Sequence, residues 1–195
     1  MRHPDYKPLL YLGYFLFGIL GMLSIYYFKE RTCYDGANYL FCAINNKWFC
    51  LFQDRWILVF SQILPLIGVY LNLSLKAIMI LHSLGNILFF FALFLMVICW
   101  NQDVVSGLAL ALLQILAVSF SFFIWPMAEV HYSIGFIFLL HSIILYQDLS
   151  RGYVGLVIFV IILLLTTSHG IGWLLFFYYR CLQLPKINSS SGKMA

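Results

Sequence analysis

The chain has 195 residues, of which 64% are hydrophobic, 19% aromatic and only 9% charged, with a formal net charge of +4. An average soluble domain is roughly 25% charged, so this composition excludes a soluble globular fold and, with it, intrinsic disorder. The 11 Lys and Arg residues form no basic stripe, so we expect no nucleic-acid partner. The composition predicts an all-α, polytopic bundle of transmembrane helices whose partners are membrane lipids.

The first apolar run covers residues 9–28 and follows the charged sequence MRHPDYKP. A membrane-spanning helix needs roughly 20 apolar residues, and this run has that length. No small-x-small cleavage site follows it, so we interpret it as an uncleaved signal anchor in a plasma membrane or a bacterial inner membrane. Tyr26 and Tyr27 stand at its end, where aromatic residues anchor helices at the membrane surface.

Residues 29–55 form the most polar stretch of the chain, which we expect to be a loop on the outward face. Within it, the segment DGANYLFCAINNKWF predicts a short amphipathic helix. Its residues Ala37, Leu40, Phe41 and Ile44 follow the i, i+3, i+4, i+7 pattern. A helix of this kind lies along the membrane surface rather than across it. The sequence therefore predicts membrane-parallel helices in the first outward loop.

Three of the five cysteines, Cys33, Cys42 and Cys50, lie in this loop, and none of the five has the spacing of a zinc site. The simpler interpretation is that they serve as small apolar side chains. The alternative is a disulfide between two of the three, which requires that the loop faces an oxidising compartment. No other metal-ligand spacing, phosphate-binding loop or nucleophile motif occurs, so we expect neither a metal nor a cofactor.

Residues 56–73 make an ambiguous apolar run, because Gln62, Pro65 and Asn72 interrupt it. The run either crosses the membrane as a kinked helix or lies in the interface. This choice decides whether Asp35 and Glu129 lie on the same side of the membrane, since only the interfacial arrangement places them together.

The remaining spans are predicted, in chain order, at residues 75–100, 104–124, 132–146 and 154–179, the last interrupted at 168–172. Ser74 is the predicted N-cap of the first of them. The chain thus has five or six membrane segments in one domain over residues 1–184, followed by a polar, disordered tail over 185–195. Counts of basic residues do not separate the two topologies, but both place the N-terminus inside and residues 29–55 outside.

Ionisable side chains close to the bilayer are costly, which makes them candidates for chemistry. Asp35 begins the amphipathic segment, where it can serve as a helix N-cap and also as a general base. Glu129 follows Trp125-Pro126 and is either an acid that compensates a helix dipole or a second catalytic acid. Arg55 stands at the water–lipid boundary, where it either contacts a lipid phosphate or simply snorkels to the interface.

Three further residues complete the candidate set for binding a substrate or a lipid phosphate. Gln62 lies one helical turn before Pro65, and its simpler role is in a helix kink. His131 follows Glu129 by two residues. His169 lies among glycines that open the backbone, although a glycine-broken helix end is the simpler interpretation.

The order of these features resembles the N-terminal module of GT-C superfamily glycosyltransferases, including multi-pass membrane proteins of this type from Bacteroidetes. The resemblance covers residues 8–172 and rests on Glu30-Arg31-Thr32-Cys33-Tyr34-Asp35, on Arg55 with Phe60-Ser61-Gln62-Ile63-Leu64-Pro65, on Ser74-Leu75-Lys76, on Trp125-Pro126-Met127-Ala128-Glu129 and on Thr167-Ser168-His169. Family members usually have more helices, so we expect this chain to match the front of such an enzyme or a truncated member.

The resemblance implies transfer of a sugar from a polyprenyl-phosphate-linked donor on the outward face. By this match Asp35 is the base, Glu129 is a second acid and Arg55 contacts the lipid phosphate. No Asp-x-Asp motif occurs, so a metal-bound donor is not expected. The alternative is a non-enzymatic membrane scaffold or lipid-binding subunit, in which these three residues tolerate replacement by Ala. A carrier or channel is less well supported, because polar residues within the predicted spans are few and dispersed.

Overall fold

The chain folds as a helical bundle. A computed structural model describes residues 7–33, 35–51, 55–119, 129–166 and 168. Within these ranges it contains seven α-helices and no strand: α1 (Lys7–Tyr26), α2 (Asp35–Asn46), α3 (Val59–Tyr70), α4 (Leu75–Leu95), α5 (Val104–Ser119), α6 (Glu129–Tyr146) and α7 (Gly152–Thr166). Three short turns complete them: η1 (Glu30–Thr32), η3 (Trp56–Leu58) and the π-helical η4 (Met96–Trp100). The all-α prediction is confirmed for this part of the chain.

Within the described ranges, three helices are long and apolar enough to cross a membrane. They are Lys7–Tyr26, Leu75–Trp100 and Glu129–Tyr146, the second of which joins α4 to η4. They agree with three of the predicted spans, with small differences at the ends. The protein is therefore a possible integral membrane protein. The second half of the run predicted at 154–179 and the tail at 185–195 lie outside the described residues, as does His169.

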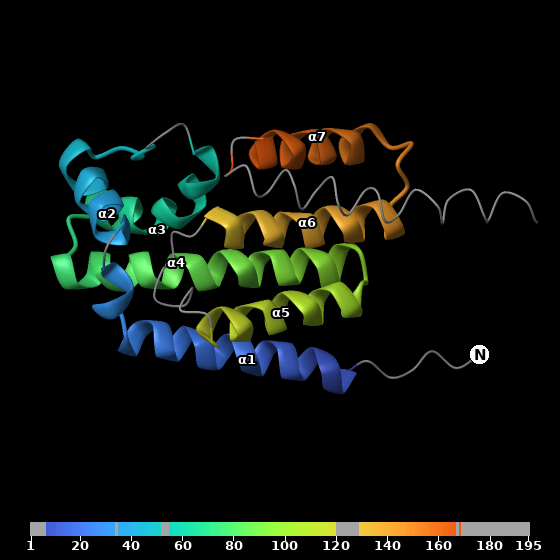
Figure 1. Cartoon of the computed structure of the whole chain (residues 1–195), viewed down its shortest axis with the longest axis horizontal. Coiled ribbons are helices and arrows are strands. Elements are labelled where there is room, and N and C mark those ends of the chain that lie inside the picture. The colour runs from blue at the N-terminus through green and yellow to red at the C-terminus, as the bar shows by residue number, and fades with distance from the viewer. Residues whose placement is uncertain (1–6, 34, 52–54, 120–128, 167, 169–195) are drawn as a thin grey trace, which may run out of the picture.

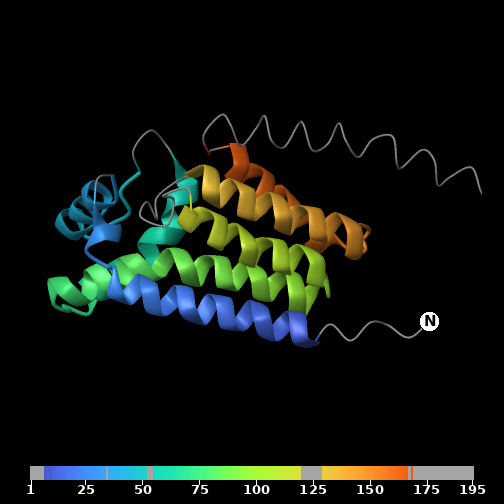
Figure 2. The ribbon, with the colours of Figure 1, turned by 60° about the horizontal axis from the view of Figure 1, so that its bottom comes forward.

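Helix α4 is the centre of the bundle. It packs against α1, α3, α5 and α6, while α7 packs on α6. Figure 1 and Figure 2 both show α1, α4, α5 and α6 side by side. Phe90 and Phe94 of α4 are fully buried between these helices. Glycines let the neighbours approach: a Cβ on Gly13 of α1 would lie 2.6 Å from Cε2 of Phe94, and one on Gly135 of α6 would lie 2.7 Å from Cε1 of Phe90.

Helix α3 lies along α4 between Ile78 and Phe89. Phe60, near its start, packs on Phe89 with tilted rings and 5.0 Å between ring centroids, and Gly68, near its end, lies against Ile78. Residues 56–70 therefore do not run the length of the bundle. Helices α2 and α3 lie toward the end of the molecule where α4 begins, here termed the α2–α3 end, and α6 begins beside η3 (Figure 1).

A proline and a glycine set the contact between α3 and α4. Pro65 lies inside α3 and has no N–H to offer the carbonyl of Ser61, four residues earlier. That carbonyl faces Gly85 of α4, where an added Cβ would lie 3.1 Å from the oxygen. The absence of a side chain at Gly85 thus allows α4 to pass close to the disturbed part of α3.

Helix α2 occupies the predicted amphipathic segment. Its buried residues are Gly36, Tyr39, Leu40 and Ala43. Of the predicted apolar face, Leu40 is buried in the bundle and Phe41 is 68% exposed. Tyr39 faces the polar residues that are described in the next subsection. Leu40 packs with Val69 and Ile78.

Candidate functional site

Four polar side chains come together at the α2–α3 end. Asp35 and Tyr39 belong to α2, Arg55 immediately precedes η3, and Glu129 opens α6. Arg55 Nη1 and Glu129 Oε1 form an ion pair. Arg55 also donates a hydrogen bond to the Tyr39 hydroxyl oxygen, since a guanidinium has donors only. Asp35 stands one helical turn before Tyr39 on the same face of α2. We call Asp35, Tyr39, Arg55 and Glu129 the polar cluster.

The polar cluster is only partly open to the surroundings. Asp35 is exposed, whereas the side chains of Arg55 and Glu129 are 29% and 13% exposed. Burial is the main cause that raises the pKa of Tyr39, and the carboxylates of Glu129 and Asp35 raise it further, against the opposing charge of Arg55. Tyr39 therefore keeps its proton at neutral pH. The arrangement offers one exposed carboxylate on the same face of α2 as a phenol that binds a guanidinium, and a second acid holds this guanidinium in an ion pair.

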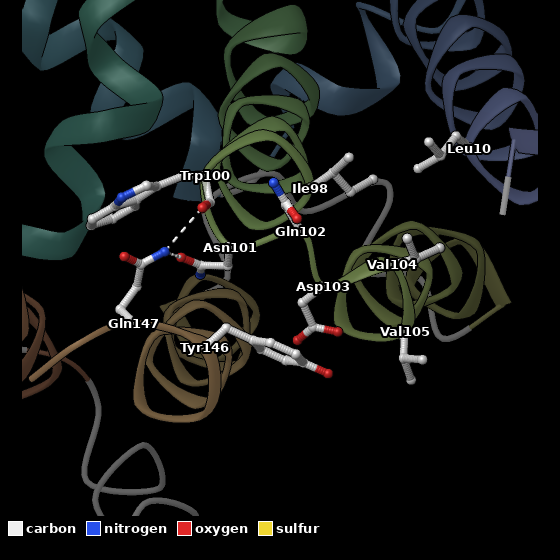
Figure 3. Close-up of a pocket in the computed structure, with 10 residues that line it drawn as sticks. All are labelled: Leu10, Ile98, Trp100, Asn101, Gln102, Asp103, Val104, Val105, Tyr146 and Gln147. Atoms are coloured by element: carbon white, nitrogen blue, oxygen red, sulfur yellow. Dashed lines mark hydrogen bonds between the residues drawn. The ribbon is translucent and has the colours of Figure 1, made fainter. Parts of the chain in front are cut away.

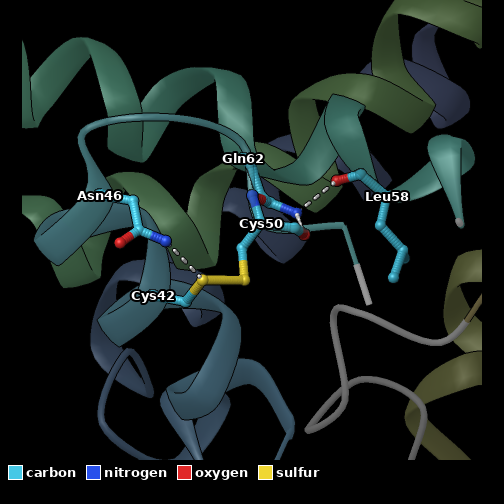
Figure 4. The surroundings of a disulfide bond; sticks show 5 residues. All are labelled: Cys42, Asn46, Cys50, Leu58 and Gln62. Atoms are coloured by element: carbon cyan, nitrogen blue, oxygen red, sulfur yellow. Dashed lines mark hydrogen bonds between the residues drawn. A yellow bond between two sulfur atoms is a disulfide. The ribbon is translucent and has the colours of Figure 1, made fainter. Parts of the chain in front are cut away.

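A disulfide and a glutamine hold α2 in this position (Figure 4). Cys42 of α2 is bonded to Cys50 in the following loop, with 5.9 Å between their Cα atoms. Both ends of the Gln62 amide bind the Cys50 backbone: Cys50 N donates to Oε1 at 2.7 Å, and Nε2 donates to the Cys50 carbonyl at 2.9 Å. The loop is thus joined to α2 on one side and to α3 on the other.

The disulfide corrects one expectation from the sequence. Cys42 and Cys50 are not merely small apolar side chains, because the loop returns Cys50 to within bonding distance of α2. Cys33 and Cys99 are free and exposed thiols. A disulfide was left open for this loop on the condition that it faces an oxidising compartment, and the structure contains one.

The other predicted binding residues lie elsewhere. Gln62 is 1% exposed and is turned to the Cys50 backbone, so it supports α2 from within. His131 is buried inside the bundle, where its Nε2 is 2.9 Å from the Gln114 amide nitrogen and its ring stacks on Phe90 with 4.3 Å between centroids. The structure thus brings Asp35, Arg55 and Glu129 together and leaves Gln62 and His131 apart from them.

Sequence reasoning missed a buried arginine. Arg31 of η1 is fully buried, and it donates from Nε to Ser83 Oγ at 2.8 Å and from Nη2 to the Ser83 carbonyl at 3.1 Å and Asn86 Oδ1 at 3.5 Å. Asn86 in turn donates to the Tyr132 hydroxyl at 3.2 Å. Burial lowers the pKa of Arg31 to about 10, so the guanidinium stays charged at neutral pH. Its signal in the sequence is the pair Ser83 and Asn86, which share one face of an otherwise apolar helix.

A cavity of about 750 Å³ lies at the opposite end of the bundle. It is lined by the ends of α1, η4, α5 and α6 (Figure 3). Gln147 donates there to the Trp100 carbonyl and to Asn101 Oδ1, both at 2.9 Å, and Asp103 Oδ1 caps α5 by accepting from Ser106 N at 3.0 Å. These bonds close the turn between η4 and α5. The cavity lies beside Tyr146, the last residue of α6, far from Glu129 at its first.

No family model matches the chain, and neither a curated protein nor a solved structure is significantly similar to it. Among the described residues, no three His, Cys, Asp or Glu side chains lie close enough together to hold a metal ion. The function is therefore argued from the polar cluster itself.

Proposed function

We propose that the chain is a membrane glycosyltransferase of the GT-C type, or the front part of one, acting on a polyprenyl-phosphate-linked sugar at its α2–α3 end. The observation that supports this most is the polar cluster. Asp35, Arg55 and Glu129 are far apart in the sequence, yet the folding of α2, α3 and α6 brings them to one place. A carboxylate beside a held guanidinium provides the two groups that such a transfer needs.

Asp35 is the proposed base. Its exposed carboxylate accepts the proton of the acceptor hydroxyl as the hydroxyl oxygen attacks the anomeric carbon of the sugar. The bond between that carbon and the lipid phosphate oxygen breaks, and the phosphate leaves with the electron pair. Arg55 compensates the charge that grows on the phosphate. Glu129 and Tyr39 position Arg55, because they hold its side chain through an ion pair and a hydrogen bond.

The disulfide supports placing this end on the outward face. Disulfides persist in oxidising compartments and are rare where thiols are kept reduced. We infer that α1, α4 with η4, α5, α6 and α7 are the membrane segments. Helix α2 then lies along the membrane surface, where Phe41 and Trp48, which are 68% and 65% exposed, face the lipid. The donor would reach the polar cluster from that surface.

The test is sugar transfer by the full chain in membranes of its own host, supplied with polyprenyl-phosphate sugars and measured as released polyprenyl phosphate. Asp35→Asn should reduce transfer by about 10²- to 10⁴-fold, the range of general-base catalysis. Asp148→Asn is the matched control, because Asp148 is exposed at the opposite end of α6. It should leave the rate unchanged.

If the Asp35→Asn variant retained sugar transfer, Asp35 would not be the base. The alternative function, a non-enzymatic lipid-binding subunit or scaffold, predicts no transfer by the wild-type chain. It also predicts normal assembly of variants in which Asp35, Arg55 or Glu129 is replaced by Ala.

A further inference from the structure

A second cavity opens at the α2–α3 end, between the end of α1 and the start of α4. Its volume is about 460 Å³, and it is lined by Phe28, Lys29, Leu75, Lys76 and Met79. Lys29 stands just before η1, and Lys76 belongs to the first turn of α4. Two segments that are separate in the chain therefore each contribute a lysine and an apolar side chain to the same hollow.

The charge around this cavity favours an anion. Both lysines are exposed, and neither forms an ion pair with a carboxylate of the described residues. Lys76 also lies where the N–H groups at the start of α4 carry the positive end of the helix dipole. Ser74 Oγ satisfies only the N–H of Ala77, at 3.3 Å. Glu30 follows Lys29 in the chain but does not line the cavity.

The walls of the cavity favour a ligand with an apolar part. Phe28 and Met79 are half-buried, and Leu75 is 61% exposed. In the turn between α3 and α4, which precedes Leu75 in the chain, Tyr70 and Leu71 are 60% and 65% exposed. Lysines that place their ammonium groups at a polar boundary above apolar side chains are typical of contacts to lipid headgroups.

We propose that this cavity binds the phosphate headgroup of an anionic membrane lipid, with Lys29 and Lys76 on the phosphate and the acyl chain along Phe28, Leu75 and Met79. This inference goes beyond the proposed function, because it assigns a second lipid site that requires no sugar and no chemistry. It holds whether or not the polar cluster transfers a sugar.

The test is native mass spectrometry of the full chain in detergent, titrated with phosphatidylglycerol. Each lysine near a membrane surface contributes about fivefold to the affinity for an anionic lipid. Lys29→Gln combined with Lys76→Gln should therefore weaken binding about 25-fold. Lys47→Gln is the matched control, because Lys47 is an exposed lysine at the end of α2 that does not line the cavity. Its affinity should equal that of the wild type.

Three outcomes would overturn the proposal. Equal weakening by Lys47→Gln would mean that net charge, and not the cavity, attracts the lipid. Inorganic phosphate that binds the chain as tightly as phosphatidylglycerol would mean that the site takes a soluble anion. Replacement of both lysines by Arg keeps the charge and should keep the affinity, so loss of binding in that variant would contradict a phosphate contact.

Discussion

Arg55 and Glu129 form an ion pair although they are 74 positions apart in the chain. Arg55 immediately precedes η3 and Glu129 is the first residue of α6, so the pair ties the segment that follows α2 to the main bundle. Both side chains are partly shielded from solvent, at 29% and 13% exposure. The pair therefore connects the two segments that carry Arg55 and Glu129 of the polar cluster, namely the segment before η3 and the start of α6.

Removing one partner of this pair should weaken the fold modestly. We expect Glu129→Gln to lower the free energy of unfolding by about 1 kcal/mol, because partly exposed ion pairs contribute about that much. The exchange Arg55→Glu with Glu129→Arg should recover most of the loss but not sugar transfer, since the guanidinium is then displaced. Thermal unfolding in detergent measures the first effect. Asp148→Asn, which breaks a pair whose side chains are 59% and 57% exposed, is the control and should change less.

Gln62 should be needed for stability. In Gln62→Leu, the backbone N–H and carbonyl of Cys50 both lose their buried partner, which should cost about 2 to 4 kcal/mol. Asn46→Ala removes only one exposed contact, 3.4 Å to the sulfur of Cys42, and should cost less than about 0.5 kcal/mol. Denaturant unfolding of the two variants in the same detergent gives the comparison. Equal effects would mean that the Gln62 bonds contribute little.

The disulfide should stabilise the α2–α3 end. Closing a loop between residues eight positions apart reduces the entropy of the unfolded chain and is worth about 2 to 3 kcal/mol. Replacing Cys42 and Cys50 by Ser should lower the unfolding temperature, whereas Cys99→Ser, at a free and exposed thiol, should not. Mass spectrometry after alkylation provides the chemical check. Cys42 and Cys50 should become labelled only after reduction, while Cys33 and Cys99 are labelled without it.

Two glycines of α1 should respond in opposite directions to replacement by Ala. Gly13→Ala would place a methyl group against the buried ring of Phe94 and should cost about 1 to 3 kcal/mol. Nothing lies within 4 Å of a Cβ at Gly18, so Gly18→Ala should gain up to about 1 kcal/mol from helix propensity. Thermal unfolding of both variants tests the packing of α1 on α4. A stable Gly13→Ala protein would contradict that packing.

Tyr39 should make the fold sensitive to alkaline pH. Its pKa in the folded protein is raised, mainly by burial and then by Glu129, so the unfolded chain loses the tyrosine proton first as the pH rises. The contribution of Tyr39 to stability is complete below pH 10, the ordinary pKa, and is lost as the pH rises through the folded value. The free energy of unfolding, measured from pH 8 to 11, should therefore fall more steeply with rising pH for the wild type than for Tyr39→Phe. The same pH dependence in both proteins would show that folding does not raise the pKa of Tyr39.

Local patterns in the sequence predict the helices well, because each depends on residues close together in the chain. Ser74 is the N-cap of α4, as predicted, and accepts a hydrogen bond from Ala77 N. Glu129 is the first residue of α6, also as predicted. The hydropathy of residues 56–73 could not show whether the run crosses the bundle. That depends on its packing against α4, which Gly68 and Gly85 allow.

The candidate site was predictable only in part. The sequence placed Asp35 and Glu129 on the same side in only one of the two arrangements of residues 56–73, and in the structure both belong to the polar cluster with Arg55. Tyr39 carries no signal of its own in the sequence, because only the fold brings its hydroxyl to Arg55. The sequence does not predict that Arg31 is buried, because an arginine in a polar loop is usually exposed to solvent. Its burial becomes evident only from its hydrogen-bond partners on α4.

The burial of Arg31 has a consequence for biogenesis. The chain is synthesised from its N-terminus, and the Ser83 hydroxyl that receives Arg31 lies 52 residues further along. Until α4 has been synthesised and packs beside α1, the hydrogen-bond partners of Arg31 on α4 are not in place. The Ser24 carbonyl, which accepts from Ser83 at 2.6 Å, joins the same contact from the α1 side. The bond between Arg31 and Ser83 therefore marks the step at which the first two long helices become a pair.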